Sequence, residues 1–138
     1  MDVQKIKDFF LRDEFALTNG IELTDVGEGY ARTSVTIEPR HLNALGVVQG
    51  GVLFSLADLA FAAATNSHGT FTMTSSANIT FLKGSNSGTI QAEARELVNH
   101  HRLPYCEVRI TDDAGSLIAM FTANGYRKQG VAIISDEP

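Results

Sequence analysis

The chain has 138 residues, 43% of them hydrophobic and 20% charged, so it can bury a real core as a single domain and need not be disordered. Its formal net charge of -5 at pH 7 and its lack of a basic cluster argue against nucleic-acid binding. One cysteine, a charged N-terminus and no apolar run long enough to span a bilayer argue against a disulfide, a signal peptide and membrane insertion, and favour the cytoplasm.

The first 18 residues are expected to form one amphipathic helix, because their apolar side chains recur at roughly helical spacing as far as Asn19-Gly20. Two strands should follow, at residues 21–26 and 30–37, with a Gly-Glu-Gly turn between them. An irregular loop over residues 41–49 then leads to a pair of glycines.

One long helix is expected over residues 52–66, a segment that is apolar nearly throughout. Four strand-like runs follow it, separated by turn sequences: residues 71–82, 89–98, 103–111 and 116–126. The tail, residues 128–138, is ambiguous: its Val-Ala-Ile-Ile run could add to a sheet edge or pack onto a partner. A helix that is apolar on nearly all sides must be covered all round, and a curved antiparallel sheet would cover it. We therefore predict an α+β fold in one domain spanning residues 1–138.

A stripe of small and polar residues runs along this helix at steps of three and four: Gly51, Ser55, Asp58, Ala62 and Thr65. Such a stripe leaves room for a second protein surface or for a ligand channel. Asp58 stands out because a buried, unpaired carboxylate is costly. Either backbone donors or an arginine (Arg95 or Arg102) satisfies it, or it has a chemical function.

The glycine pair Gly50-Gly51 offers the parts of an oxyanion site. The first N–H groups of a helix lack intrahelical partners, and glycine lets a carbonyl approach them closely. For a lone glycine pair, a tight turn is the simpler interpretation. Gly50 and Asp58 are eight residues apart, or ~12 Å along a helix, so one chain cannot easily bring both to one carbonyl. If both act together, two antiparallel helices must share each site, which predicts a homodimer with composite sites.

The segment HLNALGVVQGGVLFSLADLAFAAATNS resembles the signature of hotdog-fold acyl-CoA thioesterases of the phenylacetate-pathway (PaaI-like) group. The positions that match the signature are His41, Asn43, Gly46, Gly50, Gly51, Asp58, Asn66 and Ser67. With the later strands included, the resemblance covers roughly residues 20–127. It implies a hotdog fold, in which a curved antiparallel sheet wraps a long central helix, and hydrolysis of coenzyme A thioesters.

The resemblance also implies residue roles. Asp58 would act as nucleophile or as general base for water, Gly50 N–H of the opposite protomer would polarise the thioester carbonyl, and Asn43 would position the water or the carbonyl. The candidates for an assisting hydroxyl on the next strand are Thr74, the first choice, Ser75 and Ser76. The family forms dimers or tetramers, and here we expect a dimer of dimers. It uses no metal, and coenzyme A enters only as part of the substrate.

One position departs from the signature: the usual histidine before the two glycines is Gln49. Its amide can donate a hydrogen bond to a carbonyl, but it cannot carry charge or shuttle a proton as imidazole can. Gln49 therefore favours an alternative function, a non-catalytic acyl-CoA-binding protein on the same fold. A hydratase or dehydratase ranks last, because those enzymes usually pair an acid with a histidine and residues 49–66 contain none.

Contacts to the acyl group are expected beside the stripe. Phe54 and Phe61, together with Gly51 and Ser55, suit an aryl or short- to medium-chain acyl group. The four histidines make no metal set, and the single cysteine, Cys106, is expected to be a core thiol.

Three basic or polar side chains are candidates for the phosphates of coenzyme A: Lys83, His101 and Arg102. Solvated turn charges are the simpler interpretation of each one taken alone.

Overall fold

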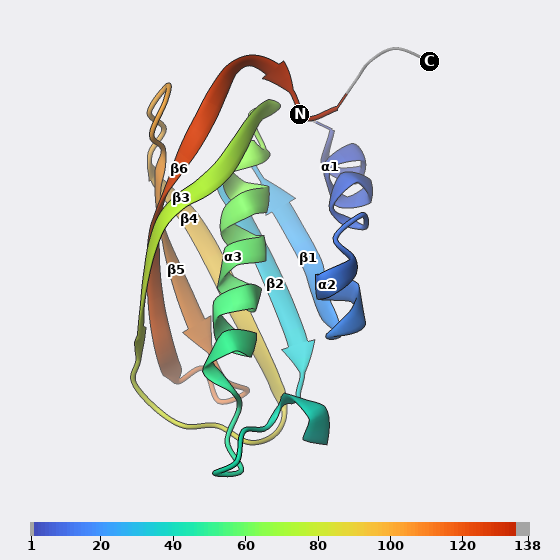
Figure 1. Ribbon diagram of the computed structural model, residues 1–138, viewed down its shortest axis with the longest axis vertical. Coiled ribbons are helices and arrows are strands. Elements are labelled where there is room, and N and C mark those ends of the chain that lie inside the picture. Colours follow the sequence, from blue (N-terminus) through green and yellow to red (C-terminus); the bar gives the residue numbers. More distant parts are fainter. Residues whose placement is uncertain (1, 135–138) are drawn as a thin grey trace.

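The computed structural model describes residues 2–134 and shows a six-stranded antiparallel sheet curved around one long helix (Figure 1). The helices are α1 (Val3–Phe10), α2 (Glu14–Thr18) and α3 (Gly50–Asn66), with a 3-10 turn, η1, at Pro39–His41. The strands are β1 (Ile21–Gly27), β2 (Tyr30–Thr36), β3 (Thr70–Phe81), β4 (Thr89–Val98), β5 (Tyr105–Thr111) and β6 (Leu117–Ala132). The strand order is β1-β2-β4-β5-β6-β3. The predicted α+β fold is confirmed.

Helix α3 forms the centre of the core. Its alanines, such as Ala57 and Ala60, are fully buried and let the sheet approach closely, while Leu56 and Phe61 fill the wider gaps. The large buried side chains that the sheet contributes are Val35, Ile90, Val108, Ile110, Ile118 and Phe121. Within residues 2–134, no helix is long and apolar enough to cross a membrane.

The N-terminal segment differs from the prediction of one helix over residues 1–18. It forms two short helices, because Asp13 starts a new one: its Oδ1 accepts a hydrogen bond from the N–H of Ala16 at 3.0 Å. Aspartate is favoured at this N-cap position, where it satisfies a free backbone donor and faces the positive end of the helix. Asp13 therefore caps α2 and does not share a helix face with Ile6.

Strand β6 runs further than predicted, to Ala132, so residues 128–132 of the supposed tail belong to the sheet. Residues 135–138 of that tail lie outside the described part of the chain. Helix α3 begins at Gly50, two residues before the predicted start, because the side chain of Gln49 provides its N-cap. The other strands match the predicted ranges within a few residues.

Strand β3 contains a bulge at Ser75, because Thr74 pairs with Gly125 and Ser76 already pairs with Asn124. An extra residue reverses the alternation of side chains along a strand. Before the bulge, Thr74 points toward α3. After it, Ile79 packs against the core, so residues on both sides of the bulge face the helix.

A buried ion pair fixes the far end of α3. Arg127 on β6 lies 3.4 Å from the carboxylate of Glu96 on β4, and the exposed fractions of the two side chains are 6% and 4%. Arg127 also donates to the carbonyl of Thr65 at the end of α3 and to the Oδ1 of Asn99. The other carboxylate oxygen of Glu96 lies 2.7 Å from Nε2 of His68.

Replacing Arg127 by Met is expected to lower the free energy of unfolding by ~3–5 kcal/mol, because it removes the guanidinium from the buried carboxylate of Glu96 and leaves that carboxylate only its contact with His68. Urea unfolding followed by circular dichroism measures this. The matched control is Arg109→Met, whose cation is 53% exposed and 3.9 Å from Glu107, and for which we expect a loss of at most ~1 kcal/mol. Equal losses for the two variants would contradict a structural role for the buried pair.

Candidate active site

Asp58 lies half-buried in the middle of α3, and its Oδ1 accepts a hydrogen bond from Thr74 Oγ1 on β3 at 2.7 Å. Of the two arginines considered for it, Arg95 lies instead 3.0 Å from Glu93 and over the ring of Tyr30. The donor found for Asp58 is a neutral hydroxyl, which satisfies one carboxylate oxygen without cancelling the negative charge.

The surroundings of Asp58 make it a stronger base than an ordinary carboxylate. Burial raises the pKa of Asp58 above its usual value of 3.8, the hydrogen bond from Thr74 lowers it in part, and the negative charge of Asp13 on the N-terminal segment raises it. A raised pKa brings the basicity of the carboxylate closer to neutral pH, where proton transfer from water is easier.

Asn66, at the end of α3, sets the position of Thr74. Its Nδ2 donates to the carbonyl of Thr72 and its Oδ1 accepts from the N–H of Thr72, each at 2.9 Å. This pair of bonds holds the start of β3 against α3, two residues before Thr74. The signature had marked Asn66 as a match, but only the structure shows what it contacts.

The start of α3 is the second half of the candidate site. The Oε1 of Gln49 accepts a hydrogen bond from the N–H of Gly51, and the carbonyl of Gln49 accepts one from Val52 N–H at 2.9 Å. In the described part of the chain, the N–H of Gly50 donates to no protein acceptor. Gly50 therefore carries the available donor of the first turn.

Phe81 and Asn43 shape the surroundings of that donor. A Cβ atom on residue 50 would lie 2.9 Å from Cζ of Phe81, so glycine is what lets the ring lie against the backbone here. The Oδ1 of Asn43 accepts from the N–H groups of Leu45 and Val47, which orders the loop before the helix. The Nδ2 group of Asn43 is its remaining hydrogen-bond donor.

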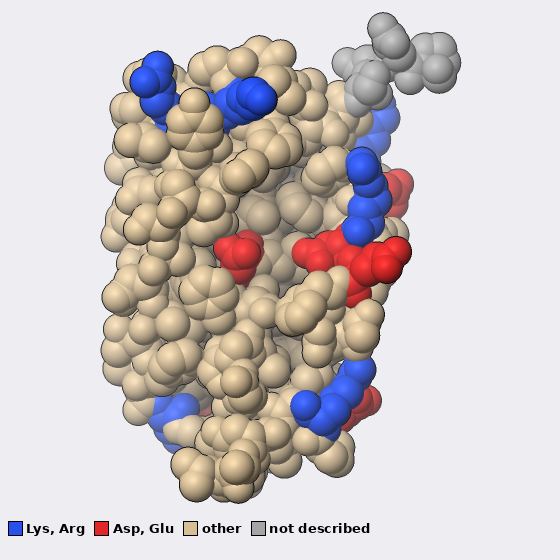
Figure 2. Space-filling view, viewed as in Figure 1, with Lys and Arg blue, Asp and Glu red and all other residues tan. Residues whose placement is uncertain are grey.

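Two cavities flank the start of α3. The α2 cavity, about 420 Å³, lies toward the β1 edge of the sheet and is lined by Phe15, Asn19, Ile21, Arg40, Leu42, Gln49, Gly51, Val52, Phe54 and Ser55. The β3 cavity, about 440 Å³, lies toward the opposite edge and is lined by Asn43, Val47, Val48, Gly50, Leu53, Phe81, Leu82, Lys83, Gly84 and Ser85. Figure 2 shows this face hollowed between the central and N-terminal helices, with acidic side chains around its middle and basic ones toward its ends.

Comparison with known proteins identifies the family. Residues 45–119, more than half of the chain, match the thioesterase superfamily. The chain belongs to this superfamily. The acyl-coenzyme A thioesterase PaaI of Escherichia coli is 32% identical over 119 residues, which cover 86% of this chain and 85% of PaaI. A protein of Archaeoglobus fulgidus with a provisional esterase name is 34% identical over 128 residues, 91% of this chain and 82% of its own.

Solved structures agree with this assignment. The structure of E. coli PaaI superimposes with a TM-score of 0.88 at 30% identity, over 93% of this chain and 94% of that one. PaaI of Thermus thermophilus gives a TM-score of 0.80 at 27% identity, over 84% and 100%. The predicted hotdog fold, the PaaI-like resemblance and the class of thioester hydrolases are thereby confirmed.

Of the four residues of this thioesterase that were predicted to contact the acyl group, three line a cavity. Gly51, Ser55 and Phe54 line the α2 cavity. Phe61 does not: it is fully buried, with its ring centroid 6.4 Å from that of Phe121, so the prediction that it touches the acyl group is wrong. Helical periodicity cannot separate a residue that lines a cavity from one that faces the sheet one turn away.

The three candidates for phosphate contact do not lie together within one chain. Lys83 follows β3 and lines the β3 cavity, where its Nζ lies 3.6 Å from Asp112. His101 and Arg102 lie in the β4–β5 loop, and the carbonyl of Arg102 accepts from Arg127 N–H beside the start of β3. Lys83 and this loop therefore lie near opposite ends of the same strand.

Proposed function

We propose that this protein hydrolyses acyl-CoA thioesters at composite sites shared by two copies of the chain. One copy would supply Asp58 and Thr74, and the other Gly50 and Asn43. The observation that carries the proposal is the half-buried Asp58 carboxylate, held at 2.7 Å by a neutral hydroxyl and with its basicity raised by burial. A purely structural carboxylate would be expected to pair with a cation or with backbone donors.

In the proposed reaction, Asp58 acts as general base for water or attacks the carbonyl itself. Thr74 holds one carboxylate oxygen, which leaves Oδ2 to reach the water or the thioester. The negative charge that develops on the carbonyl oxygen is stabilised by the N–H of Gly50, at the positive end of α3. A thiolate is a good leaving group, so this equipment suffices without a Ser-His-Asp triad.

The distance along α3 supports the proposed dimer. The helix is continuous from Gly50 to Asn66, so Gly50 and Asp58 are separated by ~12 Å of helix. Strand β3 offers the interface, because it is an edge strand whose residues, Thr70–Phe81, include no charged side chain or proline. Edge strands without such protection are usually covered by another strand. Antiparallel pairing with the partner's β3 would place the two α3 helices antiparallel.

The same pairing supports a common phosphate site. It would bring the β4–β5 loop of one copy, with His101 and Arg102, toward Lys83 of the other, since these groups lie near opposite ends of β3. We propose that they meet the phosphates of coenzyme A, with no metal or other cofactor. We also propose a dimer of dimers, for which exposed apolar side chains on the N-terminal segment, Val3 and Leu11, offer a contact away from β3.

Gln49 supports one alternative, a non-catalytic acyl-CoA binder. Its amide oxygen caps the helix, so it is not available as a proton acceptor in place of the usual histidine. The two functions differ in one readily measured respect. A thioesterase releases free thiol from acyl-CoA, whereas a binder is stabilised against heating by acyl-CoA without consuming it.

The test is free-thiol release from short-, medium- and long-chain acyl-CoAs, aryl-CoAs and the matching carrier-protein thioesters. We expect turnover of at least one coenzyme A thioester. Thermal stabilisation without thiol release from any of them would overturn the enzyme in favour of the binder.

The pH dependence of turnover should report the hydrogen bond between Thr74 and Asp58. Asp58 must be ionised, so kcat/KM should fall as the pH drops through the pKa of Asp58, which burial raises above its usual value. The Thr74 hydrogen bond lowers the pKa of Asp58, so Thr74→Val should move this acid limb to higher pH. Ser75→Ala is the control, because Ser75 bonds the carbonyl of Asn124 instead and should leave the limb in place. An unmoved acid limb in Thr74→Val would argue against Asp58 as the titrating group.

A further inference from the structure

We infer that the α2 cavity holds the acyl group of the substrate, and that Phe15 of α2 sets the length of acyl chain it accepts. The inference rests on the proposed thioesterase function. It goes further by assigning the acyl end and the coenzyme A end of the substrate to different cavities. Its basis is the different chemistry of the two cavities on either side of the Gly50 donor.

Apolar side chains from α2, β1, α3 and the residue after η1 line the α2 cavity. Its apolar lining residues are Phe15, Ile21, Leu42, Val52 and Phe54. Gln49 and Gly51 lie next to the Gly50 donor, where the thioester would enter. The cavity's other polar lining residues are Asn19, Ser55 and Arg40, whose guanidinium is paired with Glu38 at 2.8 Å. The volume of about 420 Å³ suits a small ligand group of aryl or medium-chain size.

The β3 cavity has the chemistry for the other end of the substrate. Its lining includes Gly50 itself, Asn43 and the cation of Lys83, beside the apolar residues Val47, Val48, Leu53, Phe81 and Leu82. Phe81 is the last residue of the strand that we propose as the dimer interface. A carbonyl held at Gly50 would therefore have on one side a cavity whose cation, Arg40, is already engaged by Glu38 and a backbone carbonyl. On the other side it would have a cavity with Asn43 and the exposed cation of Lys83. The acyl group suits the first, and the anionic coenzyme A suits the second.

The outer wall of the α2 cavity is anchored rather than loose. Arg40 of η1 donates to the carbonyl of Thr18 at the end of α2 and pairs with Glu38 at 2.8 Å. The Nδ1 of the buried His41 accepts from the N–H of Glu38, so in neutral His41 the proton lies on Nε2, which donates to the carbonyl of Asn19 at 2.7 Å. These bonds tie η1 to α2.

Opposite this wall, the ring of Phe54 packs edge-on against Phe121, with the ring centroids 5.3 Å apart. A wall held in this way can limit the length of an acyl chain. Phe15 is 65% exposed at its rim, so changes there should not unfold the protein.

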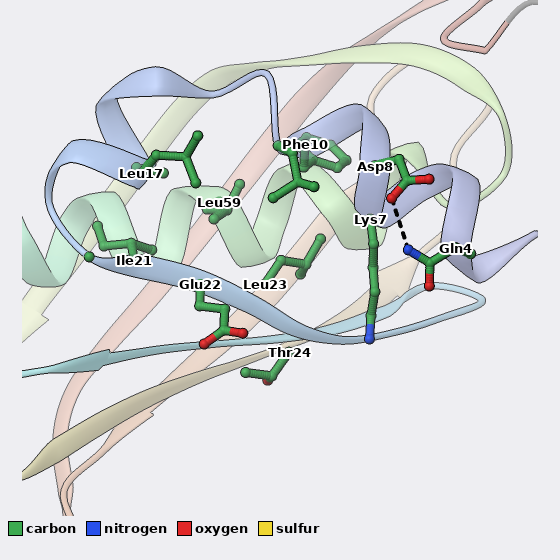
Figure 3. Close-up of a pocket in the computed structure, with 13 residues that line it drawn as sticks. Gln4, Lys7, Asp8, Phe10, Leu17, Ile21, Glu22, Leu23, Thr24 and Leu59 are labelled. Atoms are coloured by element: carbon green, nitrogen blue, oxygen red, sulfur yellow. Dashed lines mark hydrogen bonds between the residues drawn. The ribbon is translucent and has the colours of Figure 1, made fainter.

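A third cavity, about 680 Å³, lies under α1 and α2 against β1 (Figure 3). It is lined by Phe10, Leu17 and Leu23 among others, and its single residue from α3 is Leu59. It shares no residue with the first turn of α3. Leu17 lies on the same short helix as Phe15 and lines this other cavity, which makes it a matched control.

The test is kcat/KM across an acyl-CoA chain-length series for wild type, Phe15→Ala, Phe15→Trp and Leu17→Ala. We expect Phe15→Ala to raise the ratio of long-chain to optimal-chain kcat/KM about tenfold or more, and Phe15→Trp to move the optimum to shorter chains, as expected when a pocket gains or loses room for a methylene. Leu17→Ala should keep the wild-type profile. Unchanged profiles in both Phe15 variants, or an equal shift in Leu17→Ala, would overturn the inference.

The same three substitutions in an Asp58→Asn background separate this inference from the proposed activity. In these variants substrate is not consumed, so the rise in melting temperature caused by each acyl-CoA measures how well the cavity binds that chain length. If wild type releases no thiol but the Phe15 variants shift the chain length that stabilises best, the activity is wrong and the cavity assignment stands. If wild type turns over and no Phe15 variant shifts either profile, the assignment is wrong and the activity stands.

Discussion

Asp58→Asn is expected to lower kcat for acyl-CoA hydrolysis by ~10²–10⁴-fold, the usual contribution of a general base, with a much smaller effect on KM. Asparagine has nearly the same shape and can still accept the hydrogen bond from Thr74, so the cavity should be preserved while basicity is lost. Free-thiol release under saturating substrate measures the effect.

The melting temperature of Asp58→Asn is the control that separates lost activity from lost folding. Because burial raises the pKa of Asp58, its ionised form is less favourable in the folded chain than in the unfolded chain. Removing the charge should therefore leave the melting temperature at neutral pH equal to or above that of wild type. Thiol release by Asp58→Asn at the wild-type rate would remove Asp58 from the chemistry.

Gly50→Pro is expected to lower kcat by ~10²–10³-fold, because proline has no N–H and the proposed oxyanion donor is lost. The substitution suits the backbone: residue 50 is the first position of α3, where proline is favoured. The preceding residue, Gln49, already has the extended conformation that proline requires, with φ -64 and ψ 135.

The matched control is Gly50→Ala. It introduces the same Cβ beside the ring of Phe81 but retains the N–H, so it separates crowding from the loss of the donor. We expect Gly50→Ala to keep most of the activity that Gly50→Pro loses. Equal activity in the two variants would show that the Gly50 N–H contributes nothing.

Much of this architecture can be predicted from the sequence because the strongest pattern is also the central element. A helix that is apolar on nearly all sides must lie inside a sheet, and α3 does so over the predicted length plus two residues. The alternating strands after it were equally predictable. The stripe containing Asp58 identified the unusual carboxylate, and the spacing of Gly50 and Asp58 already argued for two chains.

The hydroxyl that contacts Asp58 could not be derived from the strand pattern alone, because it depends on the bulge at Ser75. The resemblance to the thioesterase signature made Thr74 the first choice, and Thr74 donates the hydrogen bond. A bulge changes which side chains face the helix, and nothing in the run Thr74-Ser75-Ser76 shows where the extra residue falls. The same limit applies to Phe61, whose burial depends on which face of α3 meets Phe121. Packing between distant segments decides both.

The N-terminal segment shows a different limit. Periodicity over residues 1–18 suited one helix, but Asp13 is a better N-cap than a helix-interior residue, and its capping bond starts α2. That break forms the wall of the α2 cavity, so Phe15 was not a predicted site residue. The capping preference of aspartate was the signal that could have identified it.

The composite site is tested most directly by mixing the two disabled chains. Asp58→Asn and Gly50→Pro, carrying different affinity tags, are co-expressed, and the heterodimer is purified through both tags. If each site takes Asp58 from one chain and Gly50 from the other, the heterodimer holds one intact site and should recover about half of the wild-type activity per dimer, although each parent is inactive. If one chain supplies both groups, every site in the heterodimer is damaged, and activity no higher than that of the parents would contradict the shared site.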